Sequence, residues 1–301
     1  QIAIMEQSHD TNTRPGFISV KEALDLHSSN NRDVVFLDGS FKRSDSIDGK
    51  EEYIRERIPG AVYFDIKEFS MKECRCPPML PTTEEFNESA SALGISNSSR
   101  IVVYGGEKAC SIARVWWMFR SFGHENVWVM EGGLERWKEA GGPIASGEPS
   151  PLPRGDFRSC GLHAAILATR EQVLGVCGTN NDSCTIVDVR PPSAFSNGRI
   201  SKSVNLPPSS VLIEGNFTAF QPPEVINKRL SDIGVTAGQK VIFSCNSGVM
   251  ASILILARYS AGEDIDNSAM YDGSYSEWVL FPDMPIDNDS EDVKYEGNSE
   301  A

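Results

Sequence analysis

The feature that most constrains the fold is an internal duplication, in which motifs of the first half recur in the same order in the second half. The apolar run that ends at Asp38 corresponds to the run that ends at Asp188, and Met130–Trp137 corresponds to Tyr271–Trp278. Matching segments lie roughly 140 to 150 residues apart, which is the size of a domain rather than the period of a solenoid. We therefore expect two copies of one domain in tandem.

Within each copy, short apolar runs alternate with helical segments, which is the pattern of parallel strands joined by crossover helices. In the first copy Arg100–Tyr104 is expected to form a buried strand, and Ser111–Phe122 the helix that follows it. The expected fold class is α/β, with tandem duplicated domains that each contain a parallel sheet flanked by helices. The expected boundaries are a first domain over 1–145, a Pro/Gly-rich linker over 146–156, a second domain over 157–286 and an acidic disordered tail over 287–301.

Charge, apolar content and cysteine usage exclude several classes of partner. A formal net charge of −14 disfavours nucleic acid and anionic membrane surfaces, and no apolar run has the length of a membrane span. The seven cysteines are scattered through both halves, which suits a reducing compartment. Cys74 and Cys76 resemble half of a metal site, but nothing completes it, so no metal is expected. We expect a cytoplasmic protein, or a mitochondrial one if a leader precedes Gln1.

One cysteine stands where chemistry could occur. The apolar run Val241–Ser244 leads directly into Cys245, and a polar turn containing Gly248 separates it from the apolar helical segment Ser252–Arg258. A strand that stops at Cys245 would place the thiol at the carboxyl end of a sheet, where open α/β folds form their clefts. Gly248 permits a sharp turn, whose amide groups before a helix would favour the nucleophilic thiolate. From these residues alone, a reactive thiol and a buried free cysteine remain equally open. The first half has Gly105 at the corresponding position.

Three motifs carry a resemblance to the two-domain rhodanese-type sulfurtransferases. They are Asp188-Val-Arg190, the loop Cys245-Asn-Ser-Gly-Val-Met-Ala251, and Asp272-Gly-Ser-Tyr-Ser-Glu-Trp278. The loop resembles that of 3-mercaptopyruvate sulfurtransferases more than that of thiosulfate sulfurtransferases, in which Arg and Lys typically follow the cysteine. The resemblance implies an enzyme that moves sulfur from 3-mercaptopyruvate, or from thiosulfate, through a persulfide on Cys245. Cyanide, a small thiol or thioredoxin would accept the sulfur, and no metal or organic cofactor is implied.

By residue matching, the resemblance also assigns roles within the site. Ser247 would hydrogen-bond the sulfur or relay a proton, and Arg190 would hold the substrate carboxylate with its planar guanidinium. The rest of the loop would form a cradle for sulfur and substrate, namely Asn246, Gly248, Val249 and Met250. The expected partners are a small-molecule sulfur donor and a thiol acceptor, and the chain is expected to be a monomer or weak dimer.

The sequence departs from the family pattern at positions that bear on the substrate. A second substrate arginine is absent from its usual place, and Arg199 or Lys202 could substitute for it. In the family a histidine of the first half has been proposed to form a Ser–His–Asp relay with the serine of the loop. This chain has Arg57 at that position, and arginine cannot accept a proton. Asp48 could occupy the acidic position of the relay at the domain interface. These departures leave open a non-catalytic rhodanese-like binding or scaffold protein with a drifted pocket. A cysteine phosphatase is disfavoured, because Ala251 stands where a Cys-x5-Arg loop needs its arginine.

Overall fold

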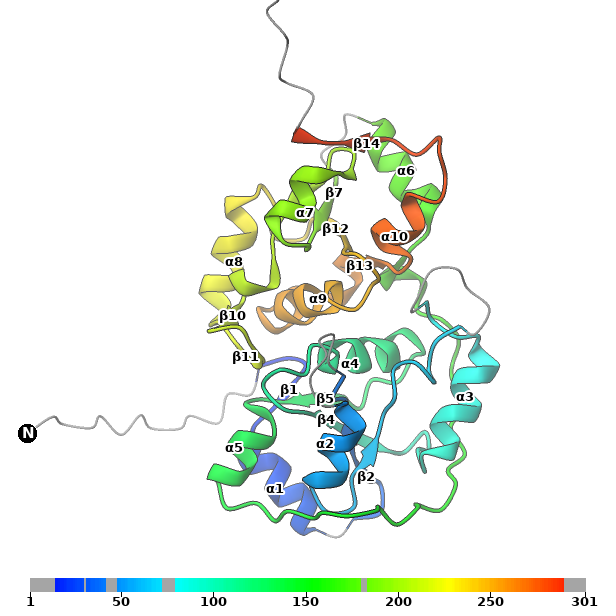
Figure 1. The fold of residues 1–301 in the computed structure, drawn as a ribbon, viewed down its shortest axis with the longest axis vertical. Coiled ribbons are helices and arrows are strands. Elements are labelled where there is room, and N and C mark those ends of the chain that lie inside the picture. The colour runs from blue at the N-terminus through cyan, green and yellow to red at the C-terminus, as the bar shows by residue number, and fades with distance from the viewer. Residues whose placement is uncertain (1–13, 30, 42–47, 72–78, 180–182, 290–301) are drawn as a thin grey trace, which may run out of the picture.

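The computed structural model describes residues 14–29, 31–41, 48–71, 79–179 and 183–289, so that Cys74 and Cys76 lie outside the described residues. Each half contains a five-stranded parallel sheet (Figure 1). The strand order in the first sheet is β1 (Phe17–Ile18), β5 (Val127–Met130), β4 (Arg100–Tyr104), β2 (Val34–Asp38), β3 (Val62–Tyr63). In the second sheet it is β6 (Leu167–Ala168), β13 (Ser268–Tyr271), β12 (Lys240–Ser244), β7 (Cys184–Asp188), β9 (Val204–Asn205). The two orders correspond strand for strand, which confirms the expected duplicated α/β fold.

Helices cover the faces of both sheets, as crossover connections between parallel strands require. Those of the first half are α1 (Val20–Ser28), α2 (Gly49–Arg55), α3 (Thr83–Ala92), α4 (Ile112–Ser121) and α5 (Gly133–Glu139). Those of the second half are α6 (Arg170–Gly178), α7 (Pro192–Asn197), α8 (Pro223–Asp232), α9 (Ala251–Ser260) and α10 (Ser274–Trp278). Two strand pairs lie outside the sheets: β10 (Leu212–Ile213) with β11 (Asn216–Phe220), and β8 (Arg199–Ile200) with β14 (Ile286–Asp287). None of the described helices combines the length and the apolar character needed to cross a bilayer.

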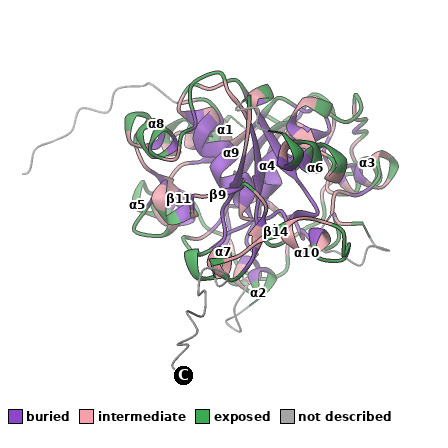
Figure 2. Ribbon diagram, turned by 90° about the horizontal axis from the view of Figure 1, so that it is seen from above, coloured by how far each residue is buried: buried purple, intermediate pink, exposed green. Residues whose placement is uncertain are grey.

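The two halves meet where α4 packs against α9, between the two sheets (Figure 1). Nearly every residue of both helices is buried, and Figure 2 shows them in purple through the middle of the molecule. Trp116 of α4 lies against Tyr259 of α9, with ring centroids 5.6 Å apart. A helix that is apolar on all sides must be covered on all sides. Each helix therefore packs on its own sheet with one face and on the opposite half with the other.

The Pro/Gly-rich stretch between the halves lies along the first half. Gly147 N donates to Ile54 O at 2.8 Å, Gly155 N donates to Ser91 O at 2.8 Å, and the Phe157 ring is buried against Phe86. This segment is therefore bonded to the surface that it crosses, and the domain limits expected at 145 and 157 remain a proposal. At the other end, residues 290–301 of the tail expected over 287–301 lie outside the described residues. Its first residues contact the second half, because Asp287 belongs to β14, opposite Arg199 of β8, and Asp289 forms an ion pair with Arg199.

A buried carboxylate distinguishes the first half from the second. Asp38 ends β2 as Asp188 ends β7, but two residues later the first half has Ser40 where the second has Arg190. Asp38 accepts hydrogen bonds from Ser40 N and from the hydroxyls of Ser40 and Tyr104, and none of the described cations forms an ion pair with it. Burial raises the pKa of Asp38 to about 6.

Replacing Asp38 by Asn is expected to stabilise the protein at neutral pH. Because the folded-state pKa lies above the ordinary value of 3.8, the native protein is most stable, with respect to this group, below pH 4 and loses that stability as the pH rises through 6. At pH 8 we expect Asp38→Asn to raise the free energy of unfolding by roughly 2 kcal/mol, and the gain should vanish near pH 4. Urea unfolding at the two pH values measures the difference.

Asp188→Asn is the matched control, since Asp188 is buried at the same strand position but is paired with Arg190. Removing that partner leaves a buried cation uncompensated, so this variant should be destabilised at both pH values. A destabilised Asp38→Asn variant at pH 8 would contradict the assignment of Asp38 as an unpaired buried acid.

Candidate active site

Cys245 directly follows β12 and precedes the turn into α9, as the sequence predicts. Its residue surface is only 2% exposed, yet it forms part of the wall of a cavity of about 570 Å³. We call this the Cys245 cavity. It lies beyond the carboxyl ends of β7 and β12 in the second sheet, which is the edge at which open α/β sheets bind ligands.

Most of the wall of the Cys245 cavity is apolar. Prolines and large side chains from the loops after β7 and β9 and from the β10–β11 hairpin supply it, including Pro191, Pro192, Pro207, Pro208, Leu212 and Phe217. Among the described residues that line it, Arg190 is the only cation, and Asn246 adds a polar group beside the cysteine. Such a cavity suits a small ligand with one anionic group and an apolar or sulfur-containing remainder.

Gly248 and Ser274 determine the shape of the turn after Cys245. Gly248 has φ +75°, and a Cβ at this position would lie 2.7 Å from Asp272 Oδ1, so only glycine fits. The Ser274 hydroxyl accepts hydrogen bonds from Cys245 N and Gly248 N, both at 3.1 Å, and donates to Tyr271 O at 2.8 Å. These two amides are therefore bonded to Ser274 rather than to the sulfur. That the other amides of the loop point at the thiol stays a prediction.

Ser274 itself has φ +53°, an uncommon backbone conformation for a residue with a side chain. Its hydroxyl is the group that brings the cysteine turn and the β13–α10 turn together. Sequence analysis did not single it out. The signal available was its position after Asp272-Gly273 in the third motif, but only the fold shows that this motif lies beside the loop.

Arg190 occupies the position expected of a substrate ligand, but part of its guanidinium is already engaged. Nε and Nη2 form a bidentate ion pair with Asp188, with Nη2 2.6 Å from Oδ2, and Nη2 also donates to Gly198 O at 2.6 Å. The guanidinium carbon lies 3.8 Å from the ring centroid of Tyr275. Arg190 nevertheless lines the Cys245 cavity. Asp188 and Tyr275 thus fix the side chain in one orientation, beside the cavity that Cys245 also lines.

The other loop residues divide into two groups. Asn246 and Met250 line the Cys245 cavity together with the nucleophile. Val249 is buried and packs with Ile66 and Cys110 of the first half, so it anchors the loop and does not face the cavity. Ser247 is half-buried in the turn and is not among the cavity-lining residues.

Arg199 is not placed as a second substrate arginine. It lies in β8, where its Nη1 is 2.6 Å from Asp289 Oδ1 and its guanidinium carbon lies 4.7 Å from the Phe195 ring centroid. It does not belong to the lining of the Cys245 cavity. The physical reason is that the C-terminal strand β14 pairs with β8 and brings a carboxylate to this arginine.

Asp48 and Arg57 were expected to contribute at the domain interface. Their hydrogen bonds are instead to α2 and to the segment that follows α5. Asp48 is the N-cap of α2, where its carboxylate accepts from Lys50 N. Arg57 is buried, and its Nη1 donates to Gly147 O at 2.6 Å. Arg57 therefore secures the segment after α5. Neither residue lines the Cys245 cavity, and this arrangement offers no proton relay through position 57.

The first half has no room for a cysteine at the position that corresponds to Cys245. A Cβ on Gly105 would lie 2.9 Å from Ser40 Oγ and 3.0 Å from Ala109 Cβ. Cys110, the neighbouring thiol in that half, is buried and donates to Phe41 O at 3.6 Å. Of the two copies, the second therefore carries the candidate nucleophile at this position.

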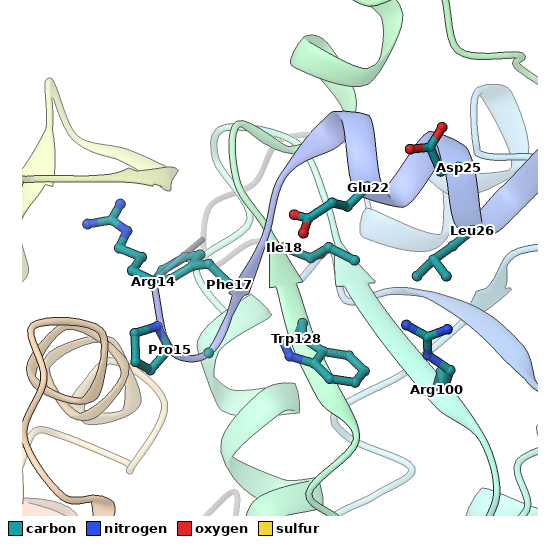
Figure 3. Close-up of a pocket in the computed structure, with 10 residues that line it drawn as sticks. Arg14, Pro15, Phe17, Ile18, Glu22, Asp25, Leu26, Arg100 and Trp128 are labelled. Carbon is teal, nitrogen blue, oxygen red and sulfur yellow. The ribbon is translucent and has the colours of Figure 1, made fainter. Parts of the chain in front are cut away.

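A second cavity, of about 440 Å³, lies at the edge of the first sheet between β1, β5 and α1 (Figure 3). Arg14 and Arg100 lie on opposite sides of Trp128 in this view. Arg14 is held by Gln221 O at 2.7 Å and by Glu131, and Arg100 lies over the Trp128 ring. Among the described residues, its lining contains no cysteine, histidine or serine; its carboxylates are Asp25 and Glu22, and Glu22 accepts hydrogen bonds from Ser19 at the start of α1. This cavity therefore has no thiol for sulfur chemistry. The described residues likewise contain no cluster of three metal-ligating side chains.

Comparison with known proteins agrees with this site. The rhodanese-like domain family matches residues 46–140 and 173–280, one stretch in each half. The chain is 35% identical over 256 residues to thiosulfate sulfurtransferase of Rattus norvegicus, covering 80% of this chain and 84% of that protein. It is 31% identical over 248 residues to 3-mercaptopyruvate sulfurtransferase of Escherichia coli K12, covering 79% and 85%. The crystal structure of SseA from Escherichia coli superimposes with a TM-score of 0.76 at 27% identity, covering 87% of this chain and 99% of that one.

A duplicated α/β fold with one cysteine at the carboxyl end of its second sheet defines a two-domain sulfurtransferase. The chain belongs to the rhodanese-like family and is an enzyme of this type. Because its relatives include both thiosulfate and 3-mercaptopyruvate sulfurtransferases, the donor has to be argued from the site.

Proposed function

We propose that the protein transfers sulfur from 3-mercaptopyruvate to a thiol through a persulfide on Cys245. The observation that carries the proposal is that Cys245 and Arg190, from adjacent strands, line one cavity. A carboxylate held by Arg190 leaves the rest of a three-carbon donor beside the thiol, and such positioning supplies a large part of the rate in transfer reactions.

In the first step the Cys245 thiolate attacks the sulfur of the donor. A bond forms between the two sulfur atoms, the carbon–sulfur bond breaks, and its electron pair remains on the carbon as the enolate of pyruvate, which takes up a proton. In the second step an acceptor thiolate attacks the outer sulfur and regenerates the Cys245 thiolate. Ser247, two residues after the nucleophile, keeps its proposed role of hydrogen-bonding the sulfur or relaying a proton on residue matching alone, because it does not line the cavity.

The character of the cavity supports 3-mercaptopyruvate over thiosulfate. Thiosulfate carries two charges, and an anion enters an apolar wall only at a large desolvation cost unless it is paired. Among the described residues, the lining of the Cys245 cavity includes one arginine, already shared with Asp188, in a chain of net charge −14. A monocarboxylate needs no second cation, so the absence of Arg199 from this site is compatible with such a donor.

We therefore expect the purified protein to use 3-mercaptopyruvate with a kcat/KM roughly tenfold or more above that for thiosulfate, because the single guanidinium satisfies one carboxylate. Pyruvate release and sulfite release, measured with the same thiol acceptor, give the two values. Higher efficiency with thiosulfate would refute the proposed donor, and no turnover with either would favour the non-catalytic alternative of a binding or scaffold protein.

The acceptor, location and assembly remain part of this proposal. A small thiol, cyanide or reduced thioredoxin would fit the second step chemically, since each can attack a sulfane sulfur. We propose a cytoplasmic or mitochondrial location and a monomer or weak dimer, on the basis of the sequence alone.

A further inference from the structure

The turn that carries Cys245 is fixed from the first half by a buried ion pair. Arg114 lies in α4 of the first half and is 1% exposed. Its Nη1 is 2.5 Å from Asp272 Oδ1 and 3.2 Å from Met270 Sδ, both in the second half. The other carboxylate oxygen of Asp272 accepts from Leu80 N of the first half at 2.7 Å. Asp272 is therefore bound by the first half at both oxygens.

Asp272 is also in direct contact with the cysteine turn. A Cβ on Gly248 would lie 2.7 Å from Asp272 Oδ1, 2.8 Å from Asp272 O and 3.2 Å from Arg114 Nη1. The ion pair thus packs against the backbone of Gly248, three residues after the nucleophile. Because Gly248 N and Cys245 N share the Ser274 hydroxyl, a displacement of Asp272 would be passed to the backbone of Cys245.

The Arg114–Asp272 ion pair also affects the electrostatics of the Cys245 turn. A buried carboxylate that touches this turn would by itself oppose the thiolate and the persulfide anion, since like charges at short range repel strongly away from water. The guanidinium of Arg114 neutralises that carboxylate. It also lies over the Trp117 ring, with its carbon 4.6 Å from the centroid, which fixes its position within α4.

We propose that Arg114 is a positioning residue for sulfur transfer: through Asp272 it sets the Cys245 turn and offsets a negative charge beside it, so that the first half prepares the nucleophile of the second. This inference rests on the proposed function for its kinetic consequence. It assigns to the first half an action on the reacting loop beyond that of covering it.

The test compares Arg114→Met with Arg114→Lys. We expect Arg114→Met to slow single-turnover persulfide formation roughly 100-fold at saturating 3-mercaptopyruvate, as expected for a misplaced reacting group, with little change in the donor concentration that gives half-saturation. Arg114→Lys should stay within roughly fivefold of the wild type, because only Nη1 reaches Asp272 and an ammonium group can replace one donor. If Arg114→Met does not fold, the double variant Arg114→Met/Asp272→Asn removes both charges, and its rate should also fall at least roughly tenfold.

The matched control is another ion pair of a buried arginine, Arg258 with Glu263, at 3.1 Å near the C-terminal end of α9. Arg258→Met/Glu263→Gln should lower thermal stability and leave the rate per folded molecule unchanged. If Arg114→Met reacts at the wild-type rate per folded molecule, or if the control pair slows the reaction equally, the proposal is overturned.

The rate at which iodoacetamide alkylates Cys245 separates this proposal from the proposed function. Slower alkylation in Arg114→Met, in a protein that forms no persulfide from any donor, would support the action of Arg114 on the loop and refute the function. Persulfide formation and alkylation at wild-type rates in Arg114→Met would leave the function intact and refute the role of Arg114.

Discussion

Cys245→Ser is expected to abolish sulfur transfer, with a loss of at least roughly 1,000-fold in pyruvate release from 3-mercaptopyruvate. A serine hydroxyl is nearly isosteric with the thiol, but it is not ionised at neutral pH and forms no persulfide. The fold should be unaffected, because the replacement is nearly isosteric and the side chain lines a cavity at the edge of the core. Steady-state kinetics with a coupled pyruvate assay measures the loss.

Cys110→Ser is the control for this variant. Cys110 is a buried thiol on the first-half side of the same loop, in contact with the cluster that contains Val249. Its replacement should change the rate by less than about threefold, since a positioned nucleophile and not thiol content governs the reaction. Unchanged turnover in Cys245→Ser would remove Cys245 from the mechanism.

Arg190→Met is expected to lower kcat/KM for 3-mercaptopyruvate by roughly 100-fold, mainly through KM. The variant loses the charge-assisted hydrogen bonds to the donor carboxylate. It also leaves the carboxylate of Asp188, 1% exposed, without its cation, which destabilises the fold by roughly 3 kcal/mol.

The double variant Arg190→Met/Asp188→Asn separates these two effects. It removes the unpaired buried charge, so the stability should largely return while KM stays high, because the ligand for the donor is still missing. Comparison of urea unfolding with kinetics for the single and double variants gives both quantities. A KM restored to the wild-type value in the double variant would show that Arg190 is structural.

The fold could be predicted because it depends on patterns along the chain. The apolar run Arg100–Tyr104 predicted β4 with the bounds that the structure has, and the duplication predicted two sheets of the same kind, which share one strand order. The position of Cys245 followed from the same reasoning, because the carboxyl end of a parallel strand has one location relative to its sheet. These features depend on local patterns, and most of the patterns occur in both halves, so each half supports the prediction made for the other.

The partners of the charged residues could not be predicted in the same way. Arg199 pairs with Asp289, 90 positions later, and Arg114 pairs with Asp272, 158 positions later. Such pairs depend on the pairing of β14 with β8 and on the packing of α4 against α9. The spacing of apolar residues along the chain does not predict these contacts. The acceptor of the Cys245 and Gly248 amides could not be predicted for a similar reason, since the Ser274 hydroxyl that accepts from both comes from another turn.

The most direct test of the account is mass spectrometry of the peptide that contains Cys245, after the protein has been incubated with 3-mercaptopyruvate without an acceptor. We predict that this peptide gains the mass of one sulfur atom, about 32 Da, and loses it when a thiol is added. A protein that releases pyruvate while the Cys245 peptide keeps its original mass, or that carries the added sulfur on another cysteine, would contradict the account.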